Sequence, residues 1–380
     1  MNRSIAIIGA GIGGLTLAAF LQKQGLKFRV FEQAEKLGEV GAGIGLWANA
    51  TNCLEQIGID DRFWSTTGCE VHKAEIANPQ RKVLSKCDVT SVTEKMGTGS
   101  FVVHRADLHN ALSSLIDSAA IIPCKRLFSL EQESEGVTLY FNDGSEERSD
   151  LVIGADGLRS KVRSELFGEK EPVYSGQTCY RGIANLFIPE RHVLREIQGQ
   201  GLRAAVIPLD DQRVYWWATE NVPEGTNREP GTIKEHLLSR FEGWAFNVPE
   251  AIAATDAGAI LQNDLYDRPP LPTWSKGSAT LLGDAAHPTT PNLGQGACMA
   301  IEDGCFLGKR LGKDDVTEVF SLYEKARKAR CESIVKESRR FGWIGGWQNP
   351  LAVRLRETIY AATPESVMRR TMEKHMVHTV

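Results

Sequence analysis

The stretch "IAIIGAGIGGLTLAAFLQKQGLKFRVFE", residues 5–32, carries the strongest structural signal in the chain. Its first four residues form a continuous apolar run, which predicts a strand buried on both faces. Gly9, Gly11 and Gly14 follow with the spacing G-x-G-x-x-G. In this motif the first glycine permits a tight turn, the second lets a pyrophosphate approach the backbone, and the third allows close helix–strand packing.

The rest of the stretch completes a strand–helix–strand unit. The sequence predicts a helix over residues 15–24, with Gly25 suited to its C-terminal cap, and a second strand in "FRVFE" that ends at Glu32. The amides at the start of that helix point toward the phosphates, and an acid at position 32 accepts hydrogen bonds from ribose hydroxyls. A ligand-free glycine turn is the alternative, but the flanking elements favour a dinucleotide site. NAD and FAD both stay open at this point.

Composition limits the class of protein. The chain has 380 residues, of which 42% are hydrophobic and 24% charged, and its net charge is −4. These values are ordinary for a soluble globular protein, and they give no basic surplus for nucleic-acid binding. We expect no signal peptide and no transmembrane segment. The eight cysteines are dispersed without metal-ligand spacing, so the sequence predicts no metal site and a cytoplasmic location.

Two segments after the first unit add weaker signals. Glycines at 41, 43 and 45 allow the backbone to run close beside a flat or bulky group, although a flexible loop explains them equally well. "SFVVHRADLHNALSSLI", residues 100–116, predicts a strand and then a helix, with Arg105 at the junction. A cation at a helix start opposes the helix dipole and indicates a nearby anion; a solvated arginine is the alternative.

After a predicted hairpin around residues 142–144, two further segments have the same strand–acid–helix organisation. "DLVIGADGLRSKVR", residues 150–163, predicts a buried strand with Asp156 and Gly157 at its carboxyl end, where α/β sheets bind ligands. "LLGDAAHPTTPNLGQG", residues 281–296, predicts a strand, Asp284, a proline-rich loop and a helix after Gly296. Asp284 is suited to binding a sugar-like polyol, and a turn or N-cap role is the alternative.

The middle of the chain changes character. Residues 171–270 contain β-branched and aromatic runs separated by turn residues, which predict antiparallel strands. Alternation in "RVYWWATE" places Tyr215 and Trp217 on one face of a strand. We therefore predict an α/β protein with a discontinuous Rossmann-type domain (residues 1–170 and 275–340). A substrate-binding domain built on an antiparallel or mixed β-sheet is inserted at 171–274, and a helical segment occupies 341–380.

Taken together and in order, the three motifs at residues 9–14, 150–163 and 281–296 resemble those of the single-component FAD-dependent aromatic hydroxylases, with the fold of para-hydroxybenzoate hydroxylase. "GQTCYRG" and "TPNLGQGACMAIED" are most similar to the urate, salicylate and alkylquinolone branch. The resemblance implies an FAD-dependent monooxygenase that uses NAD(P)H and O₂. It would hydroxylate a small aromatic or heteroaromatic substrate through a flavin C4a-hydroperoxide. A monomer or homodimer is expected. An epoxidase, an FAD reductase without oxygen activation and a nucleotide-binding sensor are the alternatives.

The resemblance also assigns site residues. The implied cofactor contacts are Gly9, Gly11, Gly13, Gly14, Glu32, Gly45, Arg105, Leu127, Asp156, Asp284, Gly294, Gly296 and Ala297. Among these, Glu32 belongs to the ADP half, Asp284 to the ribityl chain and the 293–297 turn to the isoalloxazine. The candidates for substrate binding and catalysis are Arg203, Tyr215, Asn292 and His287, and a structural role for His287 is equally open. Urate enzymes carry an acid where Asn292 stands, which argues against a carboxylate base here.

Overall fold

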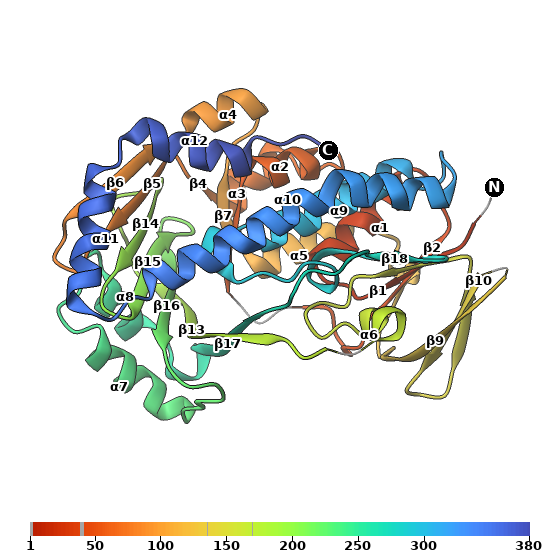
Figure 1. Ribbon diagram of the computed structural model, residues 1–380, viewed down its shortest axis with the longest axis horizontal. Coiled ribbons are helices and arrows are strands. Elements are labelled where there is room, and N and C mark those ends of the chain that lie inside the picture. The colour runs from red at the N-terminus through yellow and green to blue at the C-terminus, as the bar shows by residue number, and fades with distance from the viewer. Residues whose placement is uncertain (1–2, 39–41, 135, 169) are drawn as a thin grey trace.

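The computed structural model describes residues 3–38, 42–134, 136–168 and 170–380. Two large β-sheets lie side by side along the long axis, and the long helix α10 (Val316–Gly345) runs past both (Figure 1). Gly41, one of the glycines expected to approach a ligand closely, lies outside the described residues. Within those residues, no helix combines the length and hydropathy needed to cross a bilayer.

The first sheet has the predicted Rossmann character. Its strand order is β18-β19-β12-β1-β2-β8, and all neighbours run parallel except the edge strand β18. The strands are β1 (Ile5–Ile8), β2 (Phe28–Phe31), β8 (Ile121–Ile122), β12 (Leu151–Gly154), β18 (Ser275–Lys276) and β19 (Ala279–Leu281). Every residue of β1 is buried, as expected for a strand covered on both faces. The three sequence motifs therefore reach one edge of this sheet.

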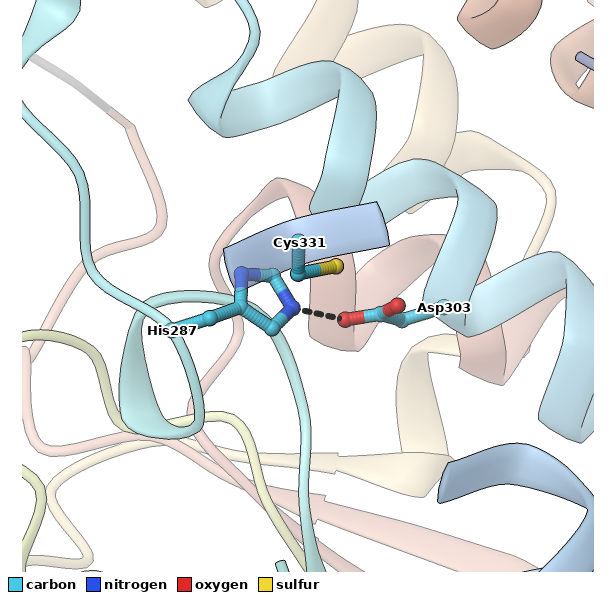
Figure 2. A group of neighbouring side chains, drawn as sticks. All are labelled: His287, Asp303 and Cys331. Carbon is cyan, nitrogen blue, oxygen red and sulfur yellow. Dashed lines mark hydrogen bonds and ion pairs between the residues drawn. The ribbon is translucent and has the colours of Figure 1, made fainter. Parts of the chain in front are cut away.

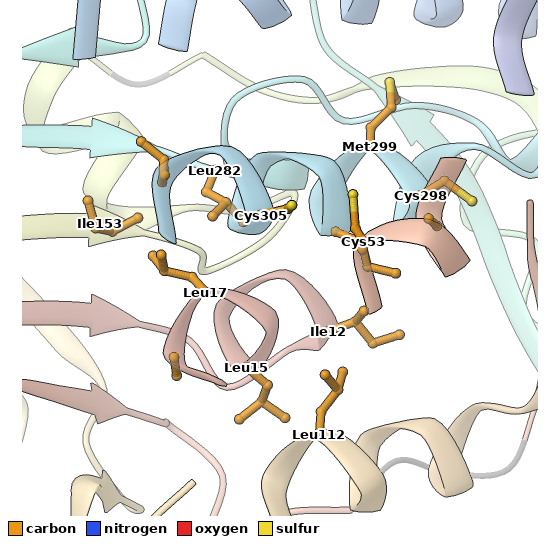
Figure 3. Close-up of a cluster of buried hydrophobic side chains, with 14 of the residues drawn as sticks. Ile12, Leu15, Leu17, Cys53, Leu112, Ile153, Leu282, Cys298, Met299 and Cys305 are labelled. Atoms are coloured by element: carbon orange, nitrogen blue, oxygen red, sulfur yellow. The ribbon is translucent and has the colours of Figure 1, made fainter. Parts of the chain in front are cut away.

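Helices cover this sheet closely. The predicted first helix is α1 (Ile12–Lys23), which begins three residues earlier than expected because the chain turns helical directly after Gly11. Gly25 adopts φ = +67° and caps its end, as predicted. Helix α9 (Gly296–Arg310) packs on α1 around apolar side chains shown in Figure 3. Gly308 permits this approach, because a Cβ there would lie 2.3 Å from Cβ of Phe20.

The remaining helices of this half surround the same core and the small sheets. They are α2 (Ala48–Glu55), α3 (Asp61–Thr67), α4 (Thr90–Met96), α5 (Arg105–Ser114) and α6 (Lys161–Phe167). One small sheet contains β3 (Gly43–Leu46), β7 (Phe101–His104) and β4 (Gly68–Glu70). The other contains β11 (Glu146–Ser149), β10 (Gly136–Phe141) and β9 (Leu127–Glu133), and it includes the predicted hairpin at residues 142–144.

The second sheet has seven strands in the order β17-β13-β16-β15-β14-β5-β6. They are β5 (Lys73–Ala77), β6 (Val83–Asp88), β13 (Val173–Asn185), β14 (Val193–Gln198), β15 (Leu202–Pro208), β16 (Arg213–Asn221) and β17 (Leu261–Asp267). It is mixed, because β14 and β5 pair in parallel. Strands β5 and β6 precede residue 171, so the N-terminal part of the chain extends this sheet.

The two faces of the second sheet have different neighbours. One face packs against α7 (Pro230–Arg240) and α8 (Val248–Ala254) around Trp216 and Phe241. Directly opposite residues of antiparallel strands share a face, and the register pairs Arg203 with Thr219 on the strand that carries Tyr215 and Trp217. These three predicted side chains therefore share the other face.

The chain ends in helices, as predicted for residues 341–380. Helix α10 is followed by α11 (Pro350–Ala362) and α12 (Glu365–Met376), which both lie along the edge strand β6 (Figure 1).

Replacing Gly14 should destabilise the fold. A Cβ at this position would lie 2.1 Å from the carbonyl oxygen of Gly9, and neither backbone segment has room to retreat. We expect Gly14→Ala to lower the free energy of unfolding by at least about 2 kcal/mol through overpacking. Urea denaturation measures this, with Gly11→Ala as the control, since a Cβ at Gly11 meets no atom within 4 Å. Equal stability of the two variants would contradict the packing argument.

Candidate active site

The glycine loop after β1 contains two kinds of glycine. Gly9 adopts φ = +107°, and a Cβ on it would lie 2.5 Å from the carbonyl oxygen of Ala155. Gly13 and Gly14 are equally constrained, because added Cβ atoms would lie 2.6 Å from Leu282 Cδ2 and 2.1 Å from the Gly9 oxygen. Gly11 differs, because a Cβ there would enter open space. The protein's own packing therefore requires glycine at positions 9, 13 and 14. Of the four loop glycines, only Gly11 borders space that an approaching ligand could use.

Glu32 closes this loop from the end of β2. Its carboxylate accepts hydrogen bonds at 2.8 Å from the backbone amides of both Ala10 and Ala34. A carboxylate has about four lone-pair positions, so two positions are left for ribose hydroxyls. Helix α1 starts beside it without a side-chain cap and without an acid in its first turn. The free amides of that turn are suited to phosphate oxygens.

His109 holds the glycine loop in place, and no sequence signal pointed to it. Its Nε2 lies 2.8 Å from the carbonyl oxygen of Ala10, inside the glycine loop, and its side chain is buried on α5. This contact ties the loop to the helix that begins at Arg105.

Asp284 follows β19 and lies in a recess between elements. Its side chain is reached by solvent although protein surrounds it. Burial raises the pKa of its carboxyl, and the charges of His287 and Arg105 act in the opposite direction. Arg105 is therefore close enough to influence this carboxyl electrostatically. A carboxylate in such a recess is suited to hydrogen bonds with ligand hydroxyls.

His287 is held in a buried charge network rather than directed at open space. Its Nε2 donates to Asp303 Oδ2 at 2.6 Å (Figure 2). The backbone amide of Gly283 donates to the same oxygen at 3.0 Å. Arg327 Nε donates to the other oxygen at 2.8 Å. Burial alone would raise the pKa of Asp303, but the charges of His287 and Arg327 outweigh it and hold the pKa at about 2.

The same group contains Cys331, whose sulfur, with the His287 and Asp303 ligand atoms, forms a set within 4.8 Å. Arg327 Nη2 donates to this sulfur at 3.7 Å, so the guanidinium already supplies a cation beside this set. The arrangement fits a hydrogen-bond network that fixes the turn before and after Asp284.

The turn at 291–294 is fixed by Trp47, another residue without a sequence signal. Trp47 Nε1 donates to the carbonyl oxygen of Leu293 at 3.2 Å. Gly294 adopts φ = +62°, and a Cβ there would lie 3.0 Å from the same nitrogen. Helix α9 begins at Gly296, directly after this turn, with no side-chain cap and no acid in its first turn. Ala297 in its first turn is half-buried, so this is a second uncapped helix start that is partly open to solvent.

Three other predicted cofactor residues have different surroundings. A Cβ at Gly45, in β3, would meet no atom within 4 Å, so this strand borders open space. Leu127 is buried in the core at the start of β9. Two residues earlier, the backbone amide of Lys125 donates to the carbonyl oxygen of Glu32 at 2.8 Å. Asp156 accepts from the amides of Lys161 and Val162 at 2.7 and 3.1 Å, so it caps α6. A cofactor role for Asp156 stays a prediction.

Arg203 and Asn292, predicted separately, are brought together. Arg203 Nη1 donates to Asn292 Oδ1 at 2.6 Å, and Arg203 Nε donates to Glu196 Oε1 at 2.9 Å. Arg203 is only 1% exposed, and its guanidinium lies 5.5 Å from the ring centroid of Trp217. Its charge is thus matched by a buried carboxylate. Glu196 was missed because only the β14–β15 register puts it on this face.

Tyr215 joins the two halves. Its ring packs on the backbone of Gly43, where a Cβ would lie 2.3 Å from Tyr215 Cγ. Burial raises the pKa of its hydroxyl, so the group stays protonated near neutral pH. The structure therefore brings Tyr215, Arg203 and Asn292 to the interface of the sheets, while His287 lies in the core behind the Asp284 turn.

Comparison with known proteins identifies the class. Residues 2–338 match the family model described as the FAD binding domain, and the chain belongs to this family. It is 36% identical to aurachin C monooxygenase/isomerase of Stigmatella aurantiaca, over 94% of this chain and 93% of that protein. It is 35% identical to zeaxanthin epoxidase of Nicotiana plumbaginifolia over 87% of this chain, but it spans only about half (53%) of that protein.

The fold comparison agrees. Klebsiella pneumoniae HpxO complexed with FAD and uric acid superimposes with a TM-score of 0.91 at 26% identity, covering 99% of this chain and 97% of that one. The chain is an FAD-dependent monooxygenase, and NAD(P)H is the usual reductant of this family. The open space at Gly11, the two uncapped helix starts and the recessed Asp284 fit that cofactor.

Replacing Gly11 should separate folding from cofactor binding. A valine at this position meets no protein atom at its Cβ, so the fold should persist, while its branched side chain fills the space that a pyrophosphate needs. We expect soluble Gly11→Val protein that releases no FAD on denaturation and takes up none when FAD is added. A flavin-loaded Gly11→Val protein would show that the cradle lies elsewhere.

Asp284→Ala should weaken FAD binding without unfolding the protein. A carboxylate that binds a ligand hydroxyl contributes on the order of 1.5–3 kcal/mol, or roughly a 10- to 150-fold change in Kd. FAD titration followed by flavin fluorescence measures this, with circular dichroism as the check on folding. Unchanged affinity would make Asp284 a turn residue only.

Proposed function

We propose that this monooxygenase hydroxylates an uncharged aromatic or heteroaromatic ring held between the seven-stranded sheet and the cofactor half. One observation carries the proposal: the guanidinium of Arg203 is buried and already paired with Glu196 and Asn292. A cation whose charge is matched internally offers little attraction to an anionic substrate. If Arg203 released Glu196 in order to bind a substrate, the buried Glu196 carboxylate would be left unpaired, at a cost of several kcal/mol.

Several of the partly buried side chains around this place are apolar, beside the cation Arg181, which pairs with Trp217 in the β13–β16 register. They are Ile44, Ile183, Trp217, Leu293 and Ala297. Such a surface favours a flat apolar ring through burial and aromatic contact. Trp217 is the best candidate platform, because its ring is partly exposed and the guanidinium of Arg203 lies over it at 5.5 Å from the centroid.

Bound FAD supplies the redox chemistry, namely reduction by NAD(P)H and activation of O₂. The chain's own contribution in this proposal is to orient the ring and to exclude water. Tyr215 keeps its proton and is suited to donating a hydrogen bond to a ring oxygen. The Asn292 amide does not accept a proton, so we expect substrates that are electron-rich without needing a base at this position.

Epoxidation is the second candidate, because the zeaxanthin epoxidases are 33–35% identical over most of this chain. Both reactions add one oxygen atom, so product mass alone does not separate them. The two reactions are separated by a substrate panel whose products are assigned by NMR. The panel contains neutral quinolones and hydroxypyridines, together with urate, salicylate and an alkene. We expect coupled NAD(P)H oxidation with the neutral rings. Preferred turnover of urate or salicylate would contradict the proposal.

Trp217→Ala should impair substrate binding selectively. Loss of one aromatic contact costs about 0.5–1.5 kcal/mol beyond the lost burial, so KM for the ring substrate should rise roughly tenfold. FAD content should be unchanged, and peroxide release should increase as the ring is held less firmly. Trp244→Ala is the matched control, because Trp244 is also half-buried but packs on the opposite face of the same sheet. An equal rise of KM in both variants would mean that the effect is one of stability.

A further inference from the structure

Helix α11 presents large apolar side chains to solvent. Leu351, Leu355 and Ile359 are 74%, 56% and 52% exposed, and their spacing of four residues places them on one side of the helix. Val353 and Arg356, on the other side, are buried against the body of the protein. Because soluble monomers rarely expose contiguous apolar stripes, this outward face indicates a surface that is covered in the functional state.

Aromatic side chains adjoin this stripe at the end of α10. Trp343 is 67% exposed, and its ring meets that of Trp347 edge to face at 5.4 Å between centroids. Only the turn at 346–349 separates these residues from α11. Tryptophan combines an apolar ring with a polar N–H and is enriched where hydrocarbon meets water.

The charge of the same region differs from that of the whole chain. Residues 336–374 contain eight Lys or Arg residues and four Glu residues, whereas the chain has a net charge of −4. Glu337 is paired with Lys374 and Glu373 with Lys95, while Arg339 is paired with Asp267 and Arg356 is buried. Arg354, Arg369 and Arg370 are exposed. The C-terminal helices are therefore a locally basic, partly apolar surface on an acidic protein.

We propose that α11, together with Trp343, docks on the surface of an anionic lipid bilayer. Leu351, Leu355 and Ile359 enter the boundary between headgroups and acyl chains, and the neighbouring arginines pair with lipid phosphates. The positive charge of the C-terminal helices favours an anionic bilayer over a second copy of the chain as the partner of this surface. In a two-fold dimer the same patch faces itself, so the arginines of both copies would be brought together.

Docking on this face has a structural consequence for the site. Helix α10 ends beside α11, and near this end Gly342 and Gly345 lie against Asn292 and Arg203, where added Cβ atoms would be 2.3 Å and 2.8 Å from those side chains. The bilayer would thus lie next to the helix end that closes the proposed ring site. The docking itself does not depend on the reaction.

Vesicle sedimentation tests the proposal with the FAD-loaded full chain. Vesicles of equal parts phosphatidylglycerol and phosphatidylcholine are compared with vesicles of phosphatidylcholine alone, at low and high salt. We expect binding to the anionic vesicles that weakens with salt and is at least tenfold weaker on phosphatidylcholine. The variant Leu351→Ser/Leu355→Ser/Ile359→Ser should lose at least tenfold in partitioning while keeping its FAD content and solubility.

Phe128→Ser is the matched control. Phe128 is 64% exposed on β9, at the end of the molecule remote from α11 (Figure 1), and its replacement should leave partitioning unchanged. Failure of the wild type to sediment with anionic vesicles would overturn the proposal, and so would equal sedimentation of the triple variant. A wild-type dimer in sedimentation velocity that the triple variant abolishes would assign the face to a second copy instead. None of these readouts measures turnover, so their failure is distinguishable from failure of the proposed hydroxylation.

Discussion

The carboxylate of Asp303 is the interaction on which the site's geometry depends. It is fully buried on α9, and it binds the Gly283 amide, His287 and Arg327 at once. An unpaired charge at this depth would cost several kcal/mol, so the two cations are a requirement rather than an addition. The three contacts fix the turn that carries Asp284 to both α9 and α10. Because α10 continues to Gly342 and Gly345, the same rigid helix contacts Asn292 and Arg203 in the other half.

The sequence predicts what local chemistry determines. Apolar runs, glycine spacing and turn residues place β1, α1, β12 and the hairpin strands to within a few residues, because each depends on neighbours in the chain. Pairings that depend on distant segments were not predictable in this way. Strands β5 and β6 join the second sheet only through the parallel pairing of β5 with β14, across more than a hundred residues. No composition or periodicity in residues 73–88 indicates that partner.

Prediction of the site from the sequence is limited in the same way, because contacts with distant segments are not visible in local sequence. Gly11 and Gly14 are indistinguishable as letters in a motif, yet one borders open space and the other touches a carbonyl oxygen. The resemblance implied that Arg203 contacts the substrate, and in the structure its charge is matched by Glu196, which only the strand register brings near. His287 lies close to the cofactor turn in sequence, and its ring is directed into the core, toward Asp303. Residue type or motif suggested a role in each case, whereas the hydrogen-bond partners depend on segments that are distant in the sequence.

Backbone shape alone does not set substrate choice in this fold if relatives differ in substrate, since the urate-complexed HpxO shares the backbone at a TM-score of 0.91 with only 26% identity. Position 292 shows how such a choice is fixed. Asn292 Nδ2 donates to Thr290 Oγ1 at 2.8 Å and to the Ser338 carbonyl at 3.0 Å, so its oxygen must face Arg203. An aspartate in the same rotamer would direct a second oxygen at that carbonyl and lose the contact to repulsion. The amide at position 292 is therefore dictated by the α10 backbone, and its oxygen keeps the guanidinium of Arg203 hydrogen-bonded within the protein.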